Sequence, residues 1–368
     1  MSEVPCRVAF FLRFLGGGGA ERVILNLSRG FVARGVKVDL VLSAGGGPHL
    51  WQVPPEVRVV DLKAPRVSAS LFDLAKYLQQ EQPLAIILAL HYTGEIAILA
   101  KRIAKVPTRV IVVEHNTLSR EVSKERGSRK FLIPLAVKYL YPWADNIVAV
   151  SQGVVKDLSA VSHLPLDKIQ VIYNPVLVPG LLEKAQEPVD HPWFAPGEPP
   201  VILGVGKLEA QKDFPNLIRA FAQVRRTKKA RLVILGWGPD RPQLESLIAD
   251  LGLEDDVALP GHVDNPYAYM AKAAVFALSS AWEGLPTVLI EAMSVGTPVV
   301  STNCESGPAE ILDNGKHGLL APVGDSNALA TAILQVLNGG SKPVDAAWFN
   351  QFGLEATTQQ YLDLFGIR

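Results

Sequence analysis

The feature that most constrains the fold is a long alternation of short apolar runs with helix-like stretches. The runs are apolar throughout, as strands buried on both faces are. In the first half they lie at 7–12, 37–42, 84–90, 109–114, 146–151 and 168–173. The stretches between them, such as 19–35, are long enough for crossover helices. The pattern predicts parallel sheets with helices on both faces.

A change in amino-acid composition interrupts this alternation. Residues 175–200 are rich in proline and acid, which is typical of a linker. Strands are expected again at 200–206, 230–236, 256–261, 274–280 and 298–302. A chain of 368 residues is too long for a single core. We therefore predict an α/β protein with two doubly wound domains facing across a cleft, with ligands beyond the carboxyl ends of the strands.

The charge balance limits the partners. The formal net charge is zero, which argues against a nucleic-acid partner. Residues 1–195 hold 23 Lys and Arg against 17 Asp and Glu, so an anionic partner fits this half best. Two distant cysteines fit a reducing compartment. The N-terminus does not resemble a signal peptide, and no apolar run is long enough to span a bilayer, so we expect a cytoplasmic protein, with attachment to the inner face of the membrane left open.

A glycine run follows the first expected strand. "FLGGGGAERVILNL" places four glycines, 16–19, directly before a helix. Glycines let the backbone approach a ligand closely, and a helix start presents amides to an anion. The alternative is a flexible turn. The run lacks the Gly-Lys-Ser/Thr of a Walker loop and the spacing of the dinucleotide fingerprint.

Two further strands are followed by polar side chains. Lys207 and Lys212 lie between an expected strand and a helix for which Asp213 is a plausible N-cap. Two cations at that place would neutralise a diphosphate, although solvated surface lysines are the alternative. His115 ends the strand 109–114 and could donate to a sugar hydroxyl or a developing charge. Its alternative is a structural histidine in the core or a loop.

The stretch "WEGLPTVLIEAM" carries the most specific signal. It predicts a helix with Pro286 at its first position that runs to about Val295, with Gly296 ending it. The free amides at 285–288 would form a phosphate seat. Glu283 precedes that seat and Glu291 follows it, so the two carboxylates could grip hydroxyl-bearing groups at either end of a ligand. Alternatively, Glu283 complements the helix dipole and Glu291 is a surface residue.

The same stretch resembles the E-x7-E signature of the retaining glycosyltransferases of family 4. Other segments resemble that family in the same order: "GGGGAERV", "VAVSQGVVKDL", "VIYNPV", "GVGKLEAQKD", "VILGWGPDRPQLE", "LPGHVDNPYAYM" and "SGPAEIL". The resemblance implies the GT-B fold, which has two Rossmann-like domains. Its implied parts are an acceptor domain at 1–175, a linker at 176–199, a nucleotide-sugar domain at 200–345 and a helical tail at 346–368 that crosses back to the first domain.

The resemblance also implies roles for single residues. Glu291 would bind the ribose and Glu283 the transferred sugar, while His115 would reach the sugar or the acceptor. The remaining implied donor contacts are Gly17 and Gly18 over the phosphates, Lys207 and Lys212 on the diphosphate, Gly284, Leu285, Pro286 and Thr287 at the helix start, and Gly236, His262 and Val263 near the base. Glu283, His115 and Lys212 would be catalytic. The family most often has arginine in place of Lys207, so a bidentate grip on phosphate is lost there while the charge is kept.

These roles imply a retaining hexosyl- or N-acetylhexosaminyltransferase that uses a nucleotide sugar as co-substrate and no cofactor. UDP is expected from its frequency in the family, and the acceptor would be a glycan or a lipid-linked sugar of cell-surface polysaccharide or glycolipid synthesis. No Asp-x-Asp metal motif is evident, so no metal is expected and the lysines would offset the leaving-group charge. The alternatives are a sugar-nucleotide epimerase, a phosphorylase or an inactive nucleotide-sugar-binding scaffold.

A basic, aromatic-flanked segment lies between two strands of the first half. Residues 119–143 hold Arg120, Lys124, Arg126, Arg129, Lys130 and Lys138, and end in Tyr139, Tyr141 and Trp143. Such a helix can lie on an anionic membrane. The alternative is an ordinary helix with a solvated basic face.

Overall fold

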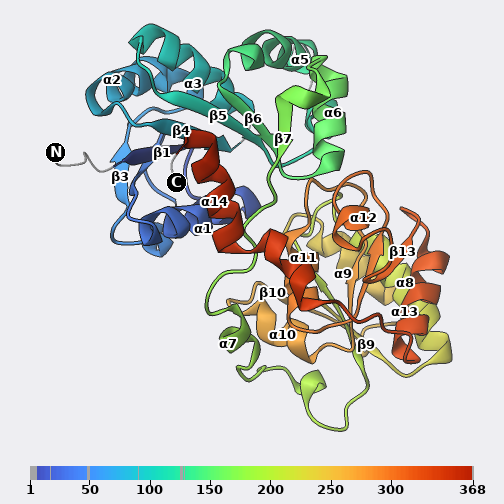
Figure 1. The fold of residues 1–368 in the computed structure, drawn as a ribbon. Helices are drawn as coiled ribbons and strands as arrows, with labels where there is room; N and C mark the ends of the chain where they lie inside the picture. The colour runs from blue at the N-terminus through green and yellow to red at the C-terminus, as the bar shows by residue number, and fades with distance from the viewer. Residues whose placement is uncertain are drawn as a thin grey trace. The chain divides into compact units, whose positions relative to one another are not determined.

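Two parallel sheets organise the chain (Figure 1). The computed structural model describes residues 6–16, 18–47, 50–89, 91–124, 127 and 129–366. The chain divides into unit 1, which is Met1–Val176 with Gln351–Arg368, and unit 2, which is Leu177–Asn350. Gly17 and Arg126 of the predicted sites lie outside the described residues, and the side chains of Lys124 and Arg129 are likewise not described.

The sheet of unit 1 has the strand order β3-β2-β1-β4-β5-β6-β7 within the described residues. Every neighbouring pair is parallel, so each connection needs a crossover. The order reverses between β1 and β4, which is the topological switch point. The strands are β1 (Arg7–Leu12), β2 (Lys37–Leu42), β3 (Arg58–Asp61), β4 (Ala85–Ala89), β5 (Arg109–Glu114), β6 (Asn146–Ala149) and β7 (Ile169–Val171).

Helices cover both faces of this sheet. On one face Phe31 of α1 packs on Phe10 of β1 and on Phe365 of the C-terminal helix α14, with ring centroids 5.8 and 5.9 Å apart. α14 therefore lies beside α1, and α2 and α3 cover the other face (Figure 1). The helices are α1 (Gly19–Ala33), α2 (Leu71–Glu81), α3 (His91–Ala104), α4 (Leu118–Lys124), α5 (Arg129–Leu140), α6 (Gln152–Ser162) and α14 (Leu354–Phe365).

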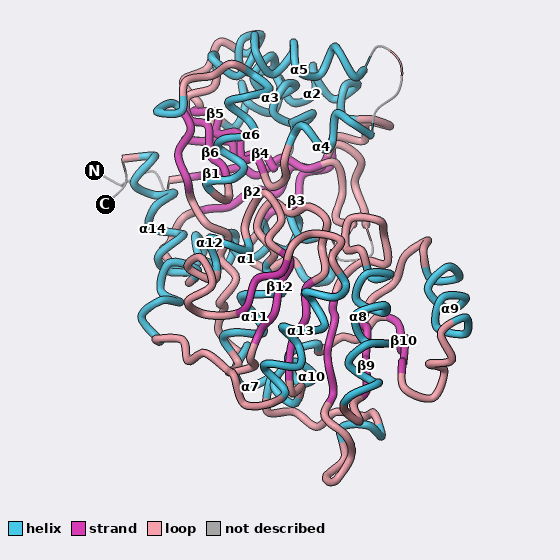
Figure 2. The backbone as a smooth tube through the Cα atoms, turned by 90° about the vertical axis from the view of Figure 1, so that its right-hand side faces the viewer, coloured by secondary structure: helices cyan, strands magenta, loops and turns pink. Residues whose placement is uncertain are grey.

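Unit 2 repeats the topology. Its described strands have the order β10-β9-β8-β11-β12-β13, again all parallel, with the switch point between β8 and β11. In Figure 2 its strands run side by side in magenta among cyan helices. The strands are β8 (Val201–Val205), β9 (Arg231–Leu235), β10 (Val257–Gly261), β11 (Val275–Leu278), β12 (Val299–Thr302) and β13 (Leu319–Ala321). The predicted doubly wound α/β class is confirmed for both units.

The helices of unit 2 bury apolar faces on this sheet. One core cluster joins Phe221, Leu244 and Ile333 of three helices to strand residues such as Ile234, all of them buried. The other face is covered by α10 and α11. The helices are α7 (Leu181–Ala185), α8 (Phe214–Thr227), α9 (Arg241–Asp250), α10 (Pro266–Lys272), α11 (Thr287–Ser294), α12 (Pro308–Ile311) and α13 (Ser326–Leu337).

Residues 177–199 of the proline-rich segment belong to unit 2. They contain α7, which packs on α10, and Asn265 donates a hydrogen bond of 2.8 Å to the Lys184 carbonyl. Phe194 packs edge-on against Tyr269 at 5.2 Å. Apolar anchors inside an acidic, proline-rich composition explain why the segment packs although its sequence is typical of a linker.

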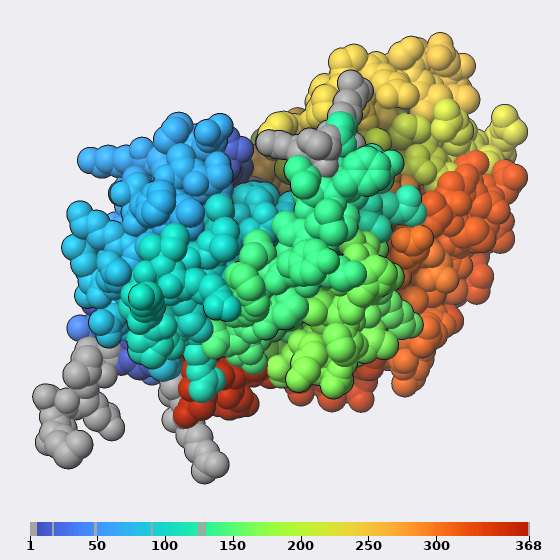
Figure 3. All heavy atoms as spheres, turned by 90° about the horizontal axis from the view of Figure 1, so that it is seen from above, coloured from blue at the N-terminus to red at the C-terminus, as the bar shows by residue number. Residues whose placement is uncertain are grey.

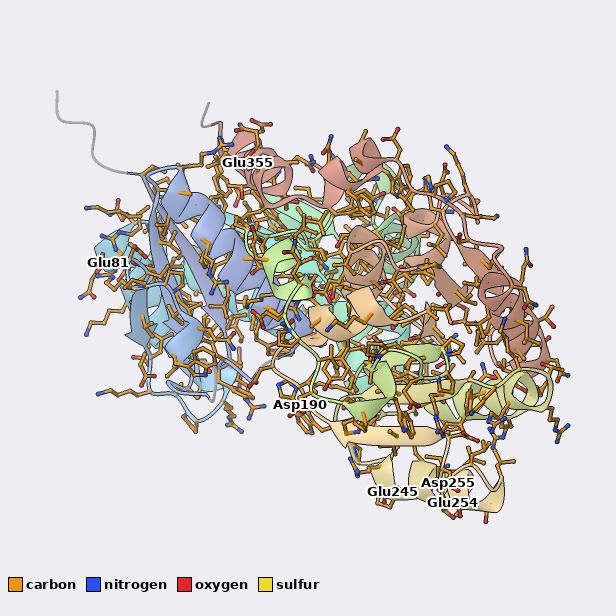
Figure 4. All side chains as sticks on the ribbon, turned by 90° about the horizontal axis from the view of Figure 1, so that it is seen from below. Glu81, Asp190, Glu245, Glu254, Asp255 and Glu355 are labelled. Carbon is orange, nitrogen blue, oxygen red and sulfur yellow. The ribbon has the colours of Figure 1, made fainter. Side chains whose placement is uncertain are left out.

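A charge network around the buried Asp39 joins the early strands of unit 1. Asp39 on β2 accepts hydrogen bonds from Arg7 at 2.7 Å, from Tyr77 at 2.7 Å and from Arg58. Burial alone would raise the pKa of Asp39, but these three donors outweigh it and lower the pKa. Arg58 also donates to Glu81 at 3.0 Å, and Figure 4 shows Glu81 at the outer edge of unit 1. This network lies toward the amino end of the sheet, where we expect stabilisation rather than ligand binding.

Candidate functional site

The switch point of unit 2 collects the predicted lysines and Glu283. The loop after β8 carries Lys207 and Lys212, and the loop after β11 carries Glu283. Since β8 and β11 are hydrogen-bonded neighbours, their carboxyl ends place these loops side by side. Lys212 Nζ lies 2.6 Å from Glu283 Oε1. Lys207 is exposed on the same loop.

Glu283 is buried and held by three donors. Besides the ion pair with Lys212, Ser280 Oγ donates to Oε1 at 2.6 Å and Gln211 Nε2 donates to Oε2 at 3.4 Å. Gln211 Nε2 also donates to the carbonyl of Trp282 at 3.1 Å. The carboxylate is therefore fixed in one orientation and its charge is matched by a partly buried ammonium. Such an arrangement is stiff enough to position a ligand.

The start of α11 is supported by the loop after β12, which carries Ser306 and Gly307. Ser306 Oγ donates to the carbonyl of Gly284 at 2.9 Å. Gly307 has φ of 94°, and a Cβ there would lie 2.4 Å from Pro286 Cδ, so only glycine fits. The structure places Pro286 at the N-cap and Thr287 at the first helical position, one residue later than predicted. The first amides of the helix therefore belong to Thr287 and Val288.

Glu291 is fully buried in the second turn of α11. The sequence pattern placed it at the edge of the apolar stripe, with a surface position as the alternative. The structure excludes the surface position. A carboxyl group is seldom taken fully out of water for packing alone.

The charge of Glu283 also affects the pKa of a neighbouring thiol, that of Cys304. Cys304 is buried, and burial together with the negative charge of Glu283 raises its thiol pKa to about 12. The thiol is therefore protonated at neutral pH and unreactive.

The loop after β9 packs directly on the lysine loop. Gly236 has φ of 138°, and a Cβ there would lie 1.9 Å from the Gly206 carbonyl oxygen. Trp237 accepts a hydrogen bond of 2.9 Å from the Leu208 amide through its backbone, while its side chain is exposed. His262, after β10, is also exposed, and Val263 is partly buried. The residues predicted near the base thus follow neighbouring strands β9 and β10.

In unit 1 the predicted residues follow β1 and β5. Gly18 is the N-cap of α1, and its carbonyl accepts from Arg22. His115 is buried, and burial lowers its pKa to about 4, so its ring is neutral at neutral pH. Within the described part of the chain, His115 Nε2 has no hydrogen-bond partner. A neutral imidazole with an uncommitted nitrogen suits a hydroxyl-bearing ligand.

Glu114 precedes His115, and its pKa is shifted in the opposite direction. Burial raises its pKa to about 7, although a hydrogen bond from Tyr141 and the nearby His91 act the other way. Burial alone would lower the pKa of His91, but its bond to Glu121 and the charges of Glu114, Glu121 and Glu95 raise it.

Two family models match the chain, "Glycosyltransferase Family 4" over residues 17–177 and "Glycosyl transferases group 1" over residues 186–347. A Campylobacter jejuni protein is 31% identical over 344 residues, which cover 90% of each chain. Its name is N-acetylgalactosamine-N,N'-diacetylbacillosaminyl-diphospho-undecaprenol 4-alpha-N-acetylgalactosaminyltransferase. This chain belongs to the family 4 glycosyltransferases. The amylovoran biosynthesis glycosyltransferase of Erwinia amylovora is 26% identical over 94% of this chain and 95% of its own length.

Solved structures place the glycosyltransferase in the GT-B fold. The Anabaena protein HepE in complex with UDP-glucose matches 98% of this chain and 99% of its own with a TM-score of 0.80 at 20% identity. The lipopolysaccharide outer core galactosyltransferase WaaB also matches over 98% of this chain and 99% of its own, with a TM-score of 0.75 at 21% identity. The predicted family and fold are confirmed.

Several residues of the glycosyltransferase site were not predicted from the sequence. Gln211 and Ser280 fix Glu283, Ser306 and Gly307 support the α11 start, and His91 begins α3 at the switch point of unit 1. Each follows a strand or lies beside a predicted residue, so position relative to strand ends was the available signal. None of the described helices combines the length and apolar character that crossing a bilayer requires.

Proposed function

We propose that this glycosyltransferase moves a hexose or N-acetylhexosamine from a UDP-sugar to a glycan or lipid-linked acceptor with retention of configuration. The observation that carries the proposal is the 2.6 Å pair of Lys212 and Glu283 beside the start of α11, with Glu291 buried in the same helix. Cation, helix start and two buried carboxylates are the groups that a nucleoside diphosphate joined to a sugar requires.

The donor roles follow from these places. Lys207, Lys212 and the amides of Thr287 and Val288 bind the diphosphate, because each offers positive charge or an N–H group. Glu291 accepts hydrogen bonds from the ribose hydroxyls, and Glu283 from hydroxyls of the transferred sugar. The base lies against the loops of Gly236 and of His262 with Val263, so Trp237 is available for stacking.

In the reaction, the bond between the sugar anomeric carbon and the diphosphate oxygen breaks, and the acceptor oxygen bonds to the same face of that carbon. The proton of the acceptor hydroxyl passes to the departing phosphate oxygen. Lys212 and the amides at the start of α11 stabilise the negative charge that develops on the diphosphate. These groups provide the electrostatic stabilisation of the leaving group without a metal. His115, neutral at neutral pH, is assigned to hydroxyls of the sugar or the acceptor.

The acceptor side rests on α5. Phe131, Leu132, Leu135 and Tyr139 are all exposed and lie on one face of this helix, opposite the buried Val137. Lys138 is exposed beside them. Figure 3, which looks onto the α5 side of unit 1, shows this green segment at the surface. An exposed apolar face with flanking cations suits an anionic membrane and a lipid-linked acceptor at its inner face.

The names of two relatives agree with such an acceptor. The Campylobacter jejuni relative carries diphospho-undecaprenol in its name, and a Salmonella typhimurium relative, 30% identical over 54% of this chain, is a lipopolysaccharide 1,6-galactosyltransferase. We therefore place the chain in the synthesis of a cell-surface polysaccharide or glycolipid.

A donor-turnover assay tests the function. Incubation with a panel of UDP-sugars should release UDP slowly without acceptor and faster with one, also in the presence of EDTA, and the product should keep the donor's anomeric configuration. Glu283→Ala should lower turnover by about 10²–10³-fold. Interconversion of sugar epimers, or near wild-type transfer by Glu283→Ala, would contradict the proposal.

Vesicle cosedimentation tests the membrane side. The wild type should bind phosphatidylglycerol vesicles at low salt and dissociate at high salt. Leu135→Ser combined with Phe131→Ser should abolish binding, whereas Phe72→Ser is the matched control because Phe72, on α2, is 71% exposed and Phe131 is 70% exposed. Equal binding by both variants would exclude α5 as the contact.

A further inference from the structure

Unit 2 contains a cavity away from the switch point, at the C-terminal end of α11. Its volume is about 670 Å³, which is within the range of small-molecule pockets. Met293, Ser294 and Gly296 line it, so the helix that carries Glu291 in its second turn reaches the cavity with its last turn.

One wall of the cavity is apolar. Leu177, Val178, Leu181 and Leu182 come from the segment that opens unit 2, and Phe349 comes from the segment that closes it. Leu181 is buried and Leu182 is exposed, so the wall reaches from the interior to the rim. Such a surface favours the apolar body of a ligand.

The cavity also has a polar wall. His317 lines it and is 5% exposed, and neither ring nitrogen has a hydrogen-bond partner among the described residues. The ring packs on Trp348, with the ring centroids 4.8 Å apart. This contact explains the position of the ring but gives its nitrogens no hydrogen-bond partner. A buried polar group without a partner is destabilising, so a native structure usually supplies a partner.

A cation lies close to His317 in the fold. Lys342 lines the cavity, and its ammonium donates to the carbonyl of Gly315, two residues before His317. The ammonium is exposed and retains further donors after this one bond. Imidazole and ammonium thus gather at the loop 315–317, while the leucines form the apolar wall.

We propose that this cavity binds an amphiphile with a single carboxylate head and an apolar chain, such as a medium-chain fatty acid. The chain lies against Leu177, Val178 and Leu181, and the carboxylate accepts hydrogen bonds from Lys342 and His317. Charge complementarity favours the carboxylate over an uncharged head. The inference concerns unit 2 alone and does not depend on the donor or acceptor.

Calorimetric titration with dodecanoate tests the proposal. The wild type should bind dodecanoate with a stoichiometry of one in this site, and dodecanol about tenfold more weakly because the ion pair is lost. Lys342→Ala and His317→Phe should each weaken dodecanoate binding by about five- to tenfold. His317→Phe keeps a ring on Trp348, so its fold should persist, which the thermal transition will show. Lys316→Ala, whose lysine is exposed and does not line the cavity, is the charge-matched control and should bind as the wild type does.

Two further variants separate this cavity from other apolar surfaces. Val178→Trp should fill the cavity and abolish binding, whereas Leu135→Ser on α5 should leave it unchanged. The proposal is overturned if dodecanoate does not bind, if Val178→Trp, Lys342→Ala and His317→Phe bind as well as the wild type, or if Leu135→Ser abolishes binding. Displacement of dodecanoate by UDP would also overturn it, since that result places the amphiphile in the donor site.

Discussion

The carboxyl edges of the two sheets each hold a buried glutamate, in different surroundings. In unit 2, Glu283 lies 2.6 Å from the ammonium of Lys212 and accepts from Ser280 at the same distance. In unit 1, Glu114 accepts from the Tyr141 hydroxyl, and burial raises its pKa to about 7. The same topology therefore presents a charged, ion-paired edge in one unit and a nearly neutral, titrating edge in the other.

This difference matches the chemistry proposed for the two edges. A diphosphate carries several negative charges and needs a cation with fixed amides, which unit 2 offers. An acceptor hydroxyl is uncharged and needs a neutral hydrogen-bonding group, which His115 offers in unit 1. Variants at each edge should therefore affect different steps.

Lys212→Ala should have the largest effect. It removes the cation from the leaving-group side and leaves Glu283 buried without its ion-pair partner, so kcat/KM for transfer should fall by about 10³-fold. Lys212→Arg should restore part of the activity because it keeps the charge. Steady-state transfer assays measure both, and the exposed Lys316→Ala provides the control. Wild-type turnover by Lys212→Ala would show that the charged edge of unit 2 has no part in the mechanism.

Glu114→Gln should change the pH dependence of stability by up to about 3 kcal/mol. The pKa of Glu114 is raised from 4.5 to about 7, so its contribution to stability is present below pH 4.5 and is lost as the pH rises through about 7. Glutamine does not ionise, so the melting temperature of the variant relative to the wild type should be higher at about pH 8 than at about pH 5. Exposed Glu56→Gln should show no such trend. An equal difference at both pH values would mean that Glu114 does not titrate in this range.

His115→Ala should separate the two edges kinetically. We expect kcat to fall by about tenfold to 100-fold because a neutral donor or acceptor near the reacting hydroxyl is lost. Affinity for UDP, measured by calorimetry, should stay within twofold of the wild type, since the diphosphate groups belong to unit 2. A loss of UDP affinity with unchanged kcat would reverse the assignment.

Gly236→Ala should have the smallest effect. A Cβ at φ of 138° meets the Gly206 carbonyl, so the lysine loop must shift and UDP affinity should fall by about tenfold. Gly46→Ala is a matched control in unit 1, because Gly46 has φ of 120° and open space around its Cβ position. If both variants bind UDP equally, the contact between the two loops of unit 2 is not important for the donor.

The central strands and the edge strands β7 and β10 could be predicted from the sequence, whereas the edge strands β3 and β13 could not. The run at 7–12 predicts β1 to the residue, since a strand buried on both faces must be apolar throughout. β3 and β13 were not predicted. Both are edge strands of four and three residues, and Val59 of β3 is exposed, so neither needs a long apolar run.

The site shows the same limit. Position after a strand was enough to select Lys212 and Glu283, because topology brings neighbouring strand ends together. It did not reveal Gln211 and Ser280 as the partners that orient Glu283, since polar residues in loops carry no periodic signal. The sequence also placed Glu291 at the edge of the helix stripe, and only the packing of α11 shows that it is fully buried.

Acidic side chains on the outside of unit 2 contrast with those at its switch point. Figure 4 shows Glu245, Glu254 and Asp255 together at one end of unit 2, on α9 and the loop that follows it. All three are exposed, so they account for part of the acidic excess of the second half without entering the site. Burial, rather than charge alone, distinguishes Glu283 and Glu291 from them.

A crystal structure of the protein with UDP tests the central claim most directly. The account predicts the β-phosphate within hydrogen-bond distance of the Thr287 or Val288 amide and of Lys212, with a ribose hydroxyl on the Glu291 carboxylate. Density for UDP elsewhere, or a ribose with no contact to Glu291, would contradict it.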